Sequence, residues 1–235
     1  MANNVFKFKQ FSVDQTGCAM KINTDGVLLA LLAQADDPKR ILDIGTGTGV
    51  LALILAQRFE HAMVEAVEIE EQASITAGKN FSNSVFNQRL KVHHIAIEQY
   101  HHALKFDLIV CNPPYFVNDL RNVEEKKGIA RHTNVVFFEE LIAKVASLLS
   151  TEGQFWFILP IKQAELLVDK AGPLGLNVIK QIHLHSDAKR PEFRRIVCLS
   201  KVVQVVIKER FNIYECDKVY TQEYKLLLKD FFLEY

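Results

Sequence analysis

Asn112, Pro113, Pro114 and Tyr115 follow the apolar run 106–111 and combine residue types that suit an amine substrate. The two prolines fix the backbone and remove two N–H donors, which leaves carbonyl oxygens free to accept hydrogen bonds from a ligand. We expect the Asn112 amide oxygen and the Pro113 carbonyl to accept hydrogen bonds from the two N–H groups of an exocyclic NH₂ group. The Tyr115 ring offers a flat surface for a base, a contact worth about 1–3 kcal/mol. The motif therefore predicts a site that holds a planar amine and turns its lone pair toward an electrophile.

A glycine-rich loop forms the second candidate site. Gly45, Gly47 and Gly49 alternate between an apolar run, 40–44, and a helical pattern, 50–58. Alternating glycines permit a tight turn in which no Cβ separates a ligand from the backbone. The N-terminus of the following helix directs free N–H groups at the same place. The loop therefore predicts a nucleotide site at the carboxyl end of a strand.

The kind of nucleotide follows from the residues around the loop. The dinucleotide fingerprint needs a third glycine where this chain has Val50, and no phosphate-loop lysine follows. Glu68, at the end of the next predicted strand, suits the two hydroxyls of a ribose and would repel a 2′-phosphate. A nicotinamide-dependent oxidoreductase or a non-catalytic nucleotide-binding module is therefore the less favoured alternative.

Strand-length apolar runs alternate with helical patterns, which is typical of βαβ units and a mostly parallel sheet. We expect strands at 40–44, 62–68, 91–95, 106–111 and 154–159, and helices at 25–35, 50–58, 71 to the low eighties, 137–149, 162–171 and 222–232. Thr24 is the expected N-cap of the first helix. The runs 177–185 and 195–207, with no helix between them, predict an antiparallel pair at the sheet edge. A long polar loop is expected from 112 to about 133.

The motifs resemble those of class I amino-methyltransferases, which use S-adenosylmethionine (SAM). At 20–29, 130–133 and 220–224 the chain is similar to the bacterial tRNA(Val) adenine-N6 methyltransferase subgroup, which modifies the adenine just 3′ of the anticodon. The likeness covers essentially the whole chain. It implies a Rossmann-like, seven-stranded, mostly parallel sheet with an antiparallel last strand and helices on both faces. One domain, 1–235, is expected, in which 1–37 forms an extension and helix bordering the cofactor.

The resemblance also implies a role for each matching residue. Asn112 to Tyr115 would hold the target amine, and Glu68 would hold the cofactor ribose. The other expected SAM-binding residues are Lys21, Thr24, Asp25, Asp43, Gly45, Thr46, Gly47, Gly49, Ala96 and Asn112. Many relatives place an acid where this chain has Ala96, so backbone groups there are expected to meet the adenine.

The substrate stays open at this level, because the same motif occurs in enzymes that methylate protein glutamine, rRNA guanine N2 or DNA adenine. Lys plus Arg and Asp plus Glu both number 28, so a polyanionic partner needs a local basic face. Two clusters flank the predicted amine site and are candidate RNA contacts: Arg121, Lys126, Lys127, Arg131 and His132, and Lys189, Arg190, Arg194 and Arg195. We expect tRNA as the partner, since a base in an anticodon loop is unstacked more easily than one in a duplex.

Metal and membrane functions are disfavoured. His183 and His185 share a strand face but have no third ligand nearby in sequence, so no metal is expected. No apolar run approaches the roughly 20 residues of a membrane span. The start of the chain has no signal-type apolar core, so a cytoplasmic protein is expected, with a monomer as the favoured state.

Overall fold

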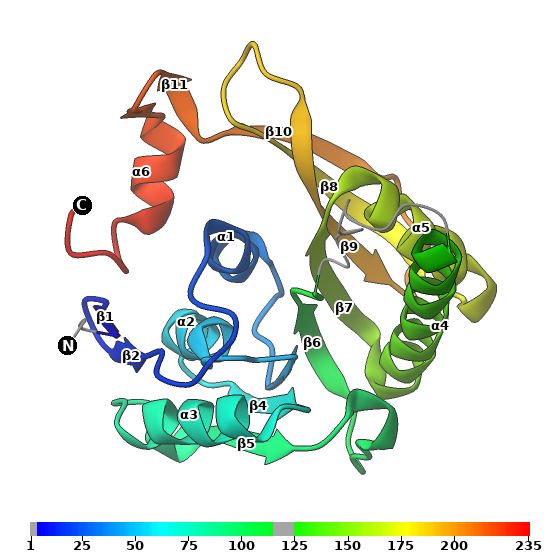
Figure 1. The fold of residues 1–235 in the computed structure, drawn as a ribbon, viewed down its shortest axis with the longest axis horizontal. Coiled ribbons are helices and arrows are strands. Elements are labelled where there is room, and N and C mark those ends of the chain that lie inside the picture. The colour runs from blue at the N-terminus through cyan, green and yellow to red at the C-terminus, as the bar shows by residue number, and fades with distance from the viewer. Residues whose placement is uncertain (1–3, 115–124) are drawn as a thin grey trace.

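The computed structural model describes residues 4–114 and 125–235, with side chains omitted for 125–134. Its centre is an eight-stranded sheet with the order β10-β8-β9-β7-β6-β3-β4-β5 (Figure 1). The strands of this sheet are β3 (Arg40–Ile44), β4 (Met63–Glu68), β5 (Leu90–His94), β6 (Phe106–Cys111), β7 (Leu149–Leu159), β8 (Asn177–His185), β9 (Glu192–Ser200) and β10 (Ile207–Asn212).

Strands β3 to β7 run parallel to one another, as the alternation of strands and helices predicted. Parallel strands end at one edge of a sheet, where open α/β sheets bind their ligands. The segments that follow β3, β4, β5 and β6 therefore meet at this edge, which we call the carboxyl edge. It holds both candidate sites.

The last strands differ from the expected pattern. β9 is antiparallel to β8, as predicted, but it lies between β7 and β8 rather than at the edge. The run 195–207 is not one strand: β9 ends at Ser200, and β10 adds an eighth strand parallel to β8, where seven strands were expected. The side chains of Val203 and Val205 are 81% and 89% exposed. These valines favour strand structure by type, but they lie in the exposed connection between β9 and β10 and not in a paired strand.

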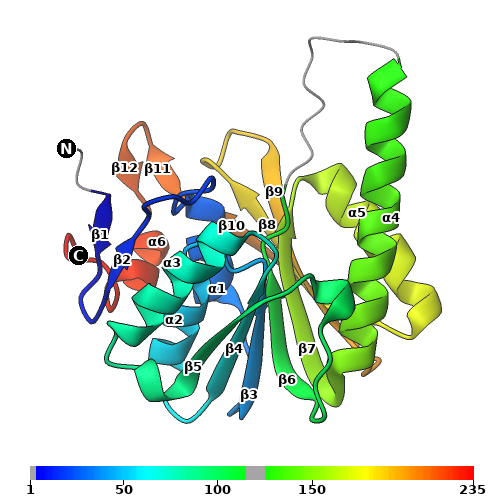
Figure 2. The ribbon, with the colours of Figure 1, turned by 60° about the horizontal axis from the view of Figure 1, so that its bottom comes forward.

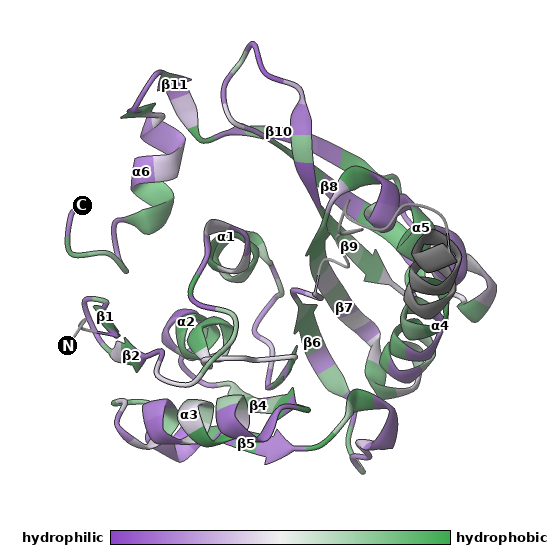
Figure 3. Ribbon diagram, in the orientation of Figure 1, coloured by the Kyte–Doolittle hydropathy of each residue, from purple (hydrophilic) through white to green (hydrophobic). Residues whose placement is uncertain are grey.

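Helices cover both faces of the sheet, as expected. α1 (Thr24–Leu32), α2 (Val50–Arg58) and α3 (Glu71–Ser82) pack on one face, and α4 (Glu125–Leu148) and α5 (Ile161–Ala171) on the other (Figure 1). α2 buries most of its residues, whereas α3 shows polar residues along its outer side (Figure 3). Short 3-10 helices η1 (Asn87–Arg89), η2 (Ile97–Gln99) and η3 (Gly172–Leu174) complete this part of the chain.

Four predicted helix boundaries were wrong. Asn23, not Thr24, caps α1, because its side-chain oxygen accepts from the Gly26 N–H at 2.8 Å. α4 begins at Glu125, inside the segment expected as a loop to about 133, because its first turns lack an apolar repeat that would mark a helix. α1 ends at Leu32 and α6 (Gln222–Leu228) at Leu228, both earlier than predicted.

The two ends of the chain form small additions beside the sheet (Figure 2). β1 (Val5–Lys7) pairs with β2 (Ser12–Asp14), and β11 (Tyr214–Cys216) pairs with β12 (Val219–Tyr220). A bridge between Phe8 and Phe232 joins the N-terminal hairpin to the segment after α6. The first of these additions leads directly into the segment that covers the carboxyl edge.

Candidate active site

The glycine loop presents bare backbone to the cavity at Gly45 and Gly47. The N–H groups of Gly45 and Thr46 donate to the Val67 carbonyl at 2.9 and 3.2 Å, so the loop is fixed to the end of β4. Gly45 and Gly47 have φ of 71° and 56°, a region that glycine adopts without strain. A Cβ built on either residue would meet no atom within 4 Å. Both glycines therefore face open space that a side chain would fill.

Asp43 organises this loop from below. Its side chain is fully buried, and Oδ2 accepts a hydrogen bond from the Thr46 hydroxyl at 2.6 Å. Its Oδ1 has no hydrogen-bond partner among the described residues. Burial raises the pKa of Asp43 to about 7. Burial therefore favours the protonated carboxyl, which shapes the turn and does not line either cavity.

Glu68 joins the loop to the end of β4. Its side chain is 8% exposed, and its Oε2 accepts from the Gly47 N–H at 2.8 Å. The other oxygen, Oε1, accepts from the Glu70 N–H at 2.9 Å. Two backbone donors therefore hold the carboxylate in one orientation, beside the loop at which the sequence predicts a nucleotide site.

Two adjoining cavities lie at the carboxyl edge. The larger has a volume of about 270 Å³ and is lined by Cys18, Ala19, Met20, Ile44, Gly45, Gly47, Val67, Glu68, Ile69, Glu70, Ala73, Ile95, Ala96, Ile97, Glu98, Cys111, Asn112, Pro113, Pro114 and Phe137. The smaller, of about 40 Å³, is lined by Met20, Lys21, Ile22, Asn23, Gly26, Gly45, Thr46, Gly47, Thr48, Val50, Leu51 and Asn112. Asn112 belongs to both walls, so the expected amine-binding residue stands between them.

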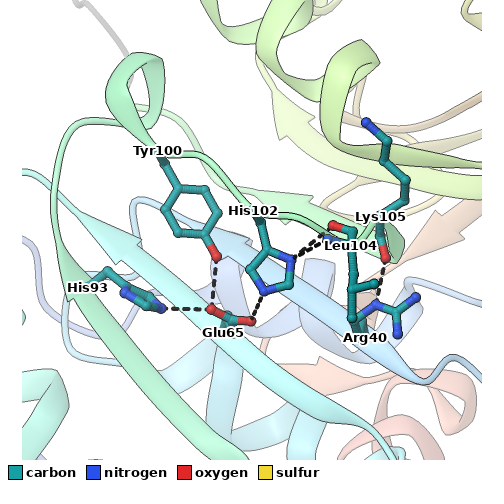
Figure 4. A network of polar contacts seen from close by, with 7 residues as sticks. All are labelled: Arg40, Glu65, His93, Tyr100, His102, Leu104 and Lys105. Carbon is teal, nitrogen blue, oxygen red and sulfur yellow. Dashed lines mark hydrogen bonds and ion pairs between the residues drawn. The ribbon is translucent and has the colours of Figure 1, made fainter.

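A polar network joins β4 and β5 to the segment that follows η2 (Figure 4). The Glu65 carboxylate accepts from the Tyr100 hydroxyl at 2.8 Å and contacts His93 Nε2 at 2.7 Å and His102 Nε2 at 3.1 Å. Burial acts to raise the pKa of Glu65, but hydrogen bonds from Tyr100 and His93 outweigh it and lower that pKa. Because Tyr100 directly follows η2, the network holds the turn that places Ala96 on the wall.

The structure brings together most of the predicted SAM-binding residues. Gly45, Gly47, Glu68, Ala96 and Asn112 line the larger cavity, and Lys21 and Thr46 line the smaller. Pro113 and Pro114 of the predicted amine site also line the larger cavity. Four predicted residues lie off both walls: Thr24, Asp25, Asp43 and Gly49. Asp25 instead pairs with Arg194 at 2.8 Å, and Gly49 is the N-cap of α2. Their places depend on contacts between elements that the motif does not show.

The predicted RNA contacts separate into two groups. Arg194 pairs with Asp25, and Arg195 pairs with Glu192 at 2.8 Å and Glu165 at 3.3 Å. Lys189 and Arg190 have exposed side chains. The remaining predicted RNA contacts lie outside the described residues or side chains: Arg121, Lys126, Lys127, Arg131 and His132. Tyr115 of the predicted amine site also lies outside the described residues.

The sequence interpretation missed several wall residues, among them Cys18, Met20 and Phe137. They come from segments that only the fold brings to the carboxyl edge. Met20 opens the family-like segment 20–29, whereas no motif marks Cys18 or Phe137. Burial raises the pKa of both wall thiols, Cys18 and Cys111. These cysteines are therefore protonated and are poor nucleophiles at neutral pH.

The carboxyl edge of this sheet carries the glycine loop, the Glu68 carboxylate and the Asn-Pro-Pro segment after β6. This combination defines a class I SAM-dependent methyltransferase. The family model described as "Methyltransferase small domain" matches residues 18–168. A Pedobacter heparinus protein named tRNA1(Val) (adenine(37)-N6)-methyltransferase is 57% identical and aligned over 99% of each chain. A Dyadobacter fermentans protein of the same name is 36% identical over 99% of each chain. The chain belongs to the methyltransferase small domain family and groups there with these relatives.

Solved structures agree with this fold. A predicted O-methyltransferase from Agrobacterium tumefaciens has a TM-score of 0.69 at 18% identity and covers 88% of this chain and 96% of its own. A methyltransferase from Pyrococcus furiosus has a TM-score of 0.56 at 20% identity and covers 80% of this chain and 91% of its own. Identities this low support the fold and leave the substrate to the site.

Within the described ranges, no group of three or more His, Cys, Asp or Glu side chains could hold a metal ion. No helix among the described residues is long and apolar enough to cross a membrane.

Proposed function

We propose that this protein transfers a methyl group from SAM to the N6 amine of an adenine in tRNA, the adenine at position 37 of tRNA1(Val) that the relatives' names state. The single observation that carries the proposal is the place of Asn112, on the shared wall of the two cavities. From there its amide reaches a ligand seated against the glycine loop and an amine brought to the same edge.

The residues at the carboxyl edge fit SAM. Gly45 and Gly47 leave open space where side chains would stand, and Glu68 presents a fixed carboxylate for a ribose diol. The mostly apolar wall beyond Glu68, including Ile95 and Ile97, suits an adenine ring. When bound, SAM supplies a methyl group on a positively charged sulfur that is already activated for transfer.

The protein's own contribution is to position the amine. The Asn112 amide oxygen and the Pro113 carbonyl accept hydrogen bonds from the two N–H groups of the amine. These bonds turn the nitrogen lone pair toward the cavity. Holding two reactants in line removes much of the entropic barrier of such a reaction. The nitrogen loses a proton to solvent once it carries the methyl group, so a strong base is not required. The protonated thiols of Cys18 and Cys111 argue against attack by a cysteine.

Partner and compartment follow from the same proposal. A tRNA substrate places the protein in the cytoplasm, where tRNA is modified. The monomeric state stays a prediction that size-exclusion chromatography with light scattering would check.

The test is transfer of labelled methyl from SAM into total RNA that lacks this modification, followed by nucleoside mass spectrometry. We expect label in N6-methyladenosine within one tRNA. Label in a protein that survives ribonuclease, in DNA or in a guanine would instead assign the enzyme to another planar amine and overturn the tRNA proposal.

Asn112→Ala tests the mechanism in the same assay. Removing the acceptor at the reacting amine should lower kcat roughly 100-fold, by analogy with the loss of one preorganised polar group in other active sites. Binding of SAM, measured by calorimetry, should weaken far less than kcat falls, because the glycine loop and Glu68 remain in place. The control is Asn177→Ala, at the start of β8 away from the carboxyl edge. Near-normal turnover of Asn112→Ala would show that another group holds the amine.

A further inference from the structure

The connection between β8 and β9, which we call the basic turn (186–191), is held rigid by its neighbours. Asp187 Oδ1 accepts from the backbone N–H groups of Lys189 at 2.8 Å and Arg190 at 3.1 Å. The Arg210 guanidinium on β10 donates to the Ala188 carbonyl at 2.9 Å. The backbone of the turn is therefore preorganised, which lowers the entropic cost of binding a partner through it.

Two cations on this turn face solvent. Among the described residues, neither the Lys189 ammonium nor the Arg190 guanidinium has a hydrogen bond or ion pair, and both side chains are exposed. The cations nearby behave differently: Arg194 and Arg195 pair with acids, and Lys180 pairs with Glu209 at 2.7 Å. Lys189 and Arg190 thus remain available for an anionic ligand.

An aromatic stack adjoins the basic turn. The rings of Tyr214 and Tyr220 stack with centroids 4.9 Å apart, and those of Tyr220 and Tyr224 with centroids 4.8 Å apart. Tyr224 is buried at one end of the stack, and Tyr214 is the partly exposed ring at the other. The outer face of Tyr214 is thus the place where a further flat ring would extend the stack.

The turn and the stack form one surface. The Tyr214 N–H donates to the Ser186 carbonyl at 2.8 Å, so the first residue of β11 touches the first residue of the basic turn. The β11–β12 hairpin and the ends of β8 and β9 lie side by side in Figure 2. Glu215, Asp217 and Lys218 occupy the hairpin beyond Tyr214, so the positive charge comes from the turn itself.

This surface lies on the carboxyl edge. β9 is antiparallel to both β7 and β8, so β8 runs in the same direction as β6 and β7. β8 therefore ends, at His185, on the same edge of the sheet as β6. The connection from β8 to β9 lies at this edge, where Asn112 follows β6. A ring platform beside unpaired cations is the combination that binds single-stranded nucleic acid, with bases stacked on rings and phosphates at the cations.

We propose that Tyr214 and the basic turn dock the RNA loop strand next to the target adenine, with a base on the Tyr214 ring and phosphates at Lys189 and Arg190. The proposal rests on the proposed tRNA methyltransferase function and adds where the RNA lies. It also explains how a protein with zero net charge binds a polyanion through a small local surface.

The experiment measures methyl transfer to the unmodified tRNA by Lys189→Ala/Arg190→Ala and by Tyr214→Leu. The double variant should raise KM for tRNA at least tenfold with little change in kcat or in SAM binding. Its dependence of log KM on log salt should become shallower by about 1.4, the value for two lost contacts to single-stranded phosphates. Tyr214→Leu should raise KM about tenfold without changing the salt slope, since it removes a stacking ring and no charge.

Matched controls isolate the surface. Lys91→Ala/Lys229→Ala removes two exposed cations from β5 and the end of α6 and should leave KM and the salt slope unchanged. Tyr214→Phe keeps the ring and should bind tRNA as the wild type does. Wild-type activity on tRNA together with an unaltered KM and slope in the basic-turn variant would overturn the docking surface alone. No transfer to tRNA by the wild type would overturn the proposed function itself.

Discussion

Two acids at the glycine loop show how burial assigns different tasks to the same functional group. Glu68 accepts from two backbone N–H groups and stands on the cavity wall. Asp43 is fully buried, and its Oδ1 has no partner among the described residues. The backbone donors fix the orientation of the Glu68 side chain, whereas the desolvated Asp43 carboxyl resists ionisation. The first suits ligand binding and the second suits loop architecture.

The raised pKa of Asp43 predicts a specific pH dependence of stability. The folded protein keeps this proton up to a pKa of about 7, whereas the unfolded chain releases it near the ordinary value of 3.8. The folded state therefore binds more protons between these values, so the contribution of Asp43 to stability falls as pH rises from about 4 to 7. The loss is on the order of a few kcal/mol, since one pKa unit is worth about 1.4 kcal/mol.

Urea unfolding of the wild type and Asp43→Asn at several pH values between 4 and 8 measures this effect. The difference in unfolding free energy between the two proteins should shift in favour of the variant as pH rises. A difference that is constant across this range would show that Asp43 titrates normally in the folded protein.

At the scale of elements, Gly49 shows that one glycine of the loop serves packing rather than ligand binding. It has φ of 84° at the N-cap of α2, and a Cβ there would lie 2.6 Å from the Phe81 ring of α3. The glycine therefore lets α2 and α3 approach each other behind the loop. Gly45 and Gly47, four and two residues earlier, face the open cavity instead.

Gly49→Ala should accordingly destabilise the protein by about 2–5 kcal/mol, the sum of left-handed backbone strain and overpacking against Phe81. The control is Gly78→Ala inside α3, where the atom nearest to a Cβ would lie 3.4 Å away, an ordinary van der Waals contact. That substitution should be neutral or slightly stabilising. Denaturant midpoints measure both, and equal midpoints for the two variants would contradict the packing role of Gly49.

The whole molecule is closed by contacts between its two ends. Phe8 is 4% exposed and packs its ring against Phe11 at 4.5 Å and Phe232 at 5.1 Å. The chain between β2 and α1 then supplies Cys18, Ala19 and Met20 to the cavity wall. The packing of the termini therefore supports a segment that borders the candidate cofactor site.

Phe8→Ala should lower the free energy of unfolding by about 3–5 kcal/mol, the usual cost of truncating a buried phenylalanine. The control is Leu233→Ala, whose side chain is 62% exposed and should have little effect. Urea denaturation measures both variants. A loss below about 0.5 kcal/mol for Phe8→Ala, the range of ordinary surface substitutions, would show that the ends are not cooperative with the sheet.

The sequence by itself determined the parallel part of the sheet, the glycine loop, Glu68 and the Asn112 motif. These features depend on local patterns: strand and helix periodicity, glycine at turns and proline at a strand exit. They placed Gly45, Gly47, Glu68 and Asn112 correctly on one edge, because parallel strands all end at the same side of a sheet.

Only the tertiary structure decided which residues line the cavities and which pack against other helices and strands. Gly49 packs against Phe81, Asp25 pairs with Arg194, and β9 inserts between β7 and β8. Each of these depends on a contact between segments distant in the chain, which no local pattern records. The same long-range packing brings Tyr214 beside the basic turn, so the proposed RNA surface exists only in the folded protein.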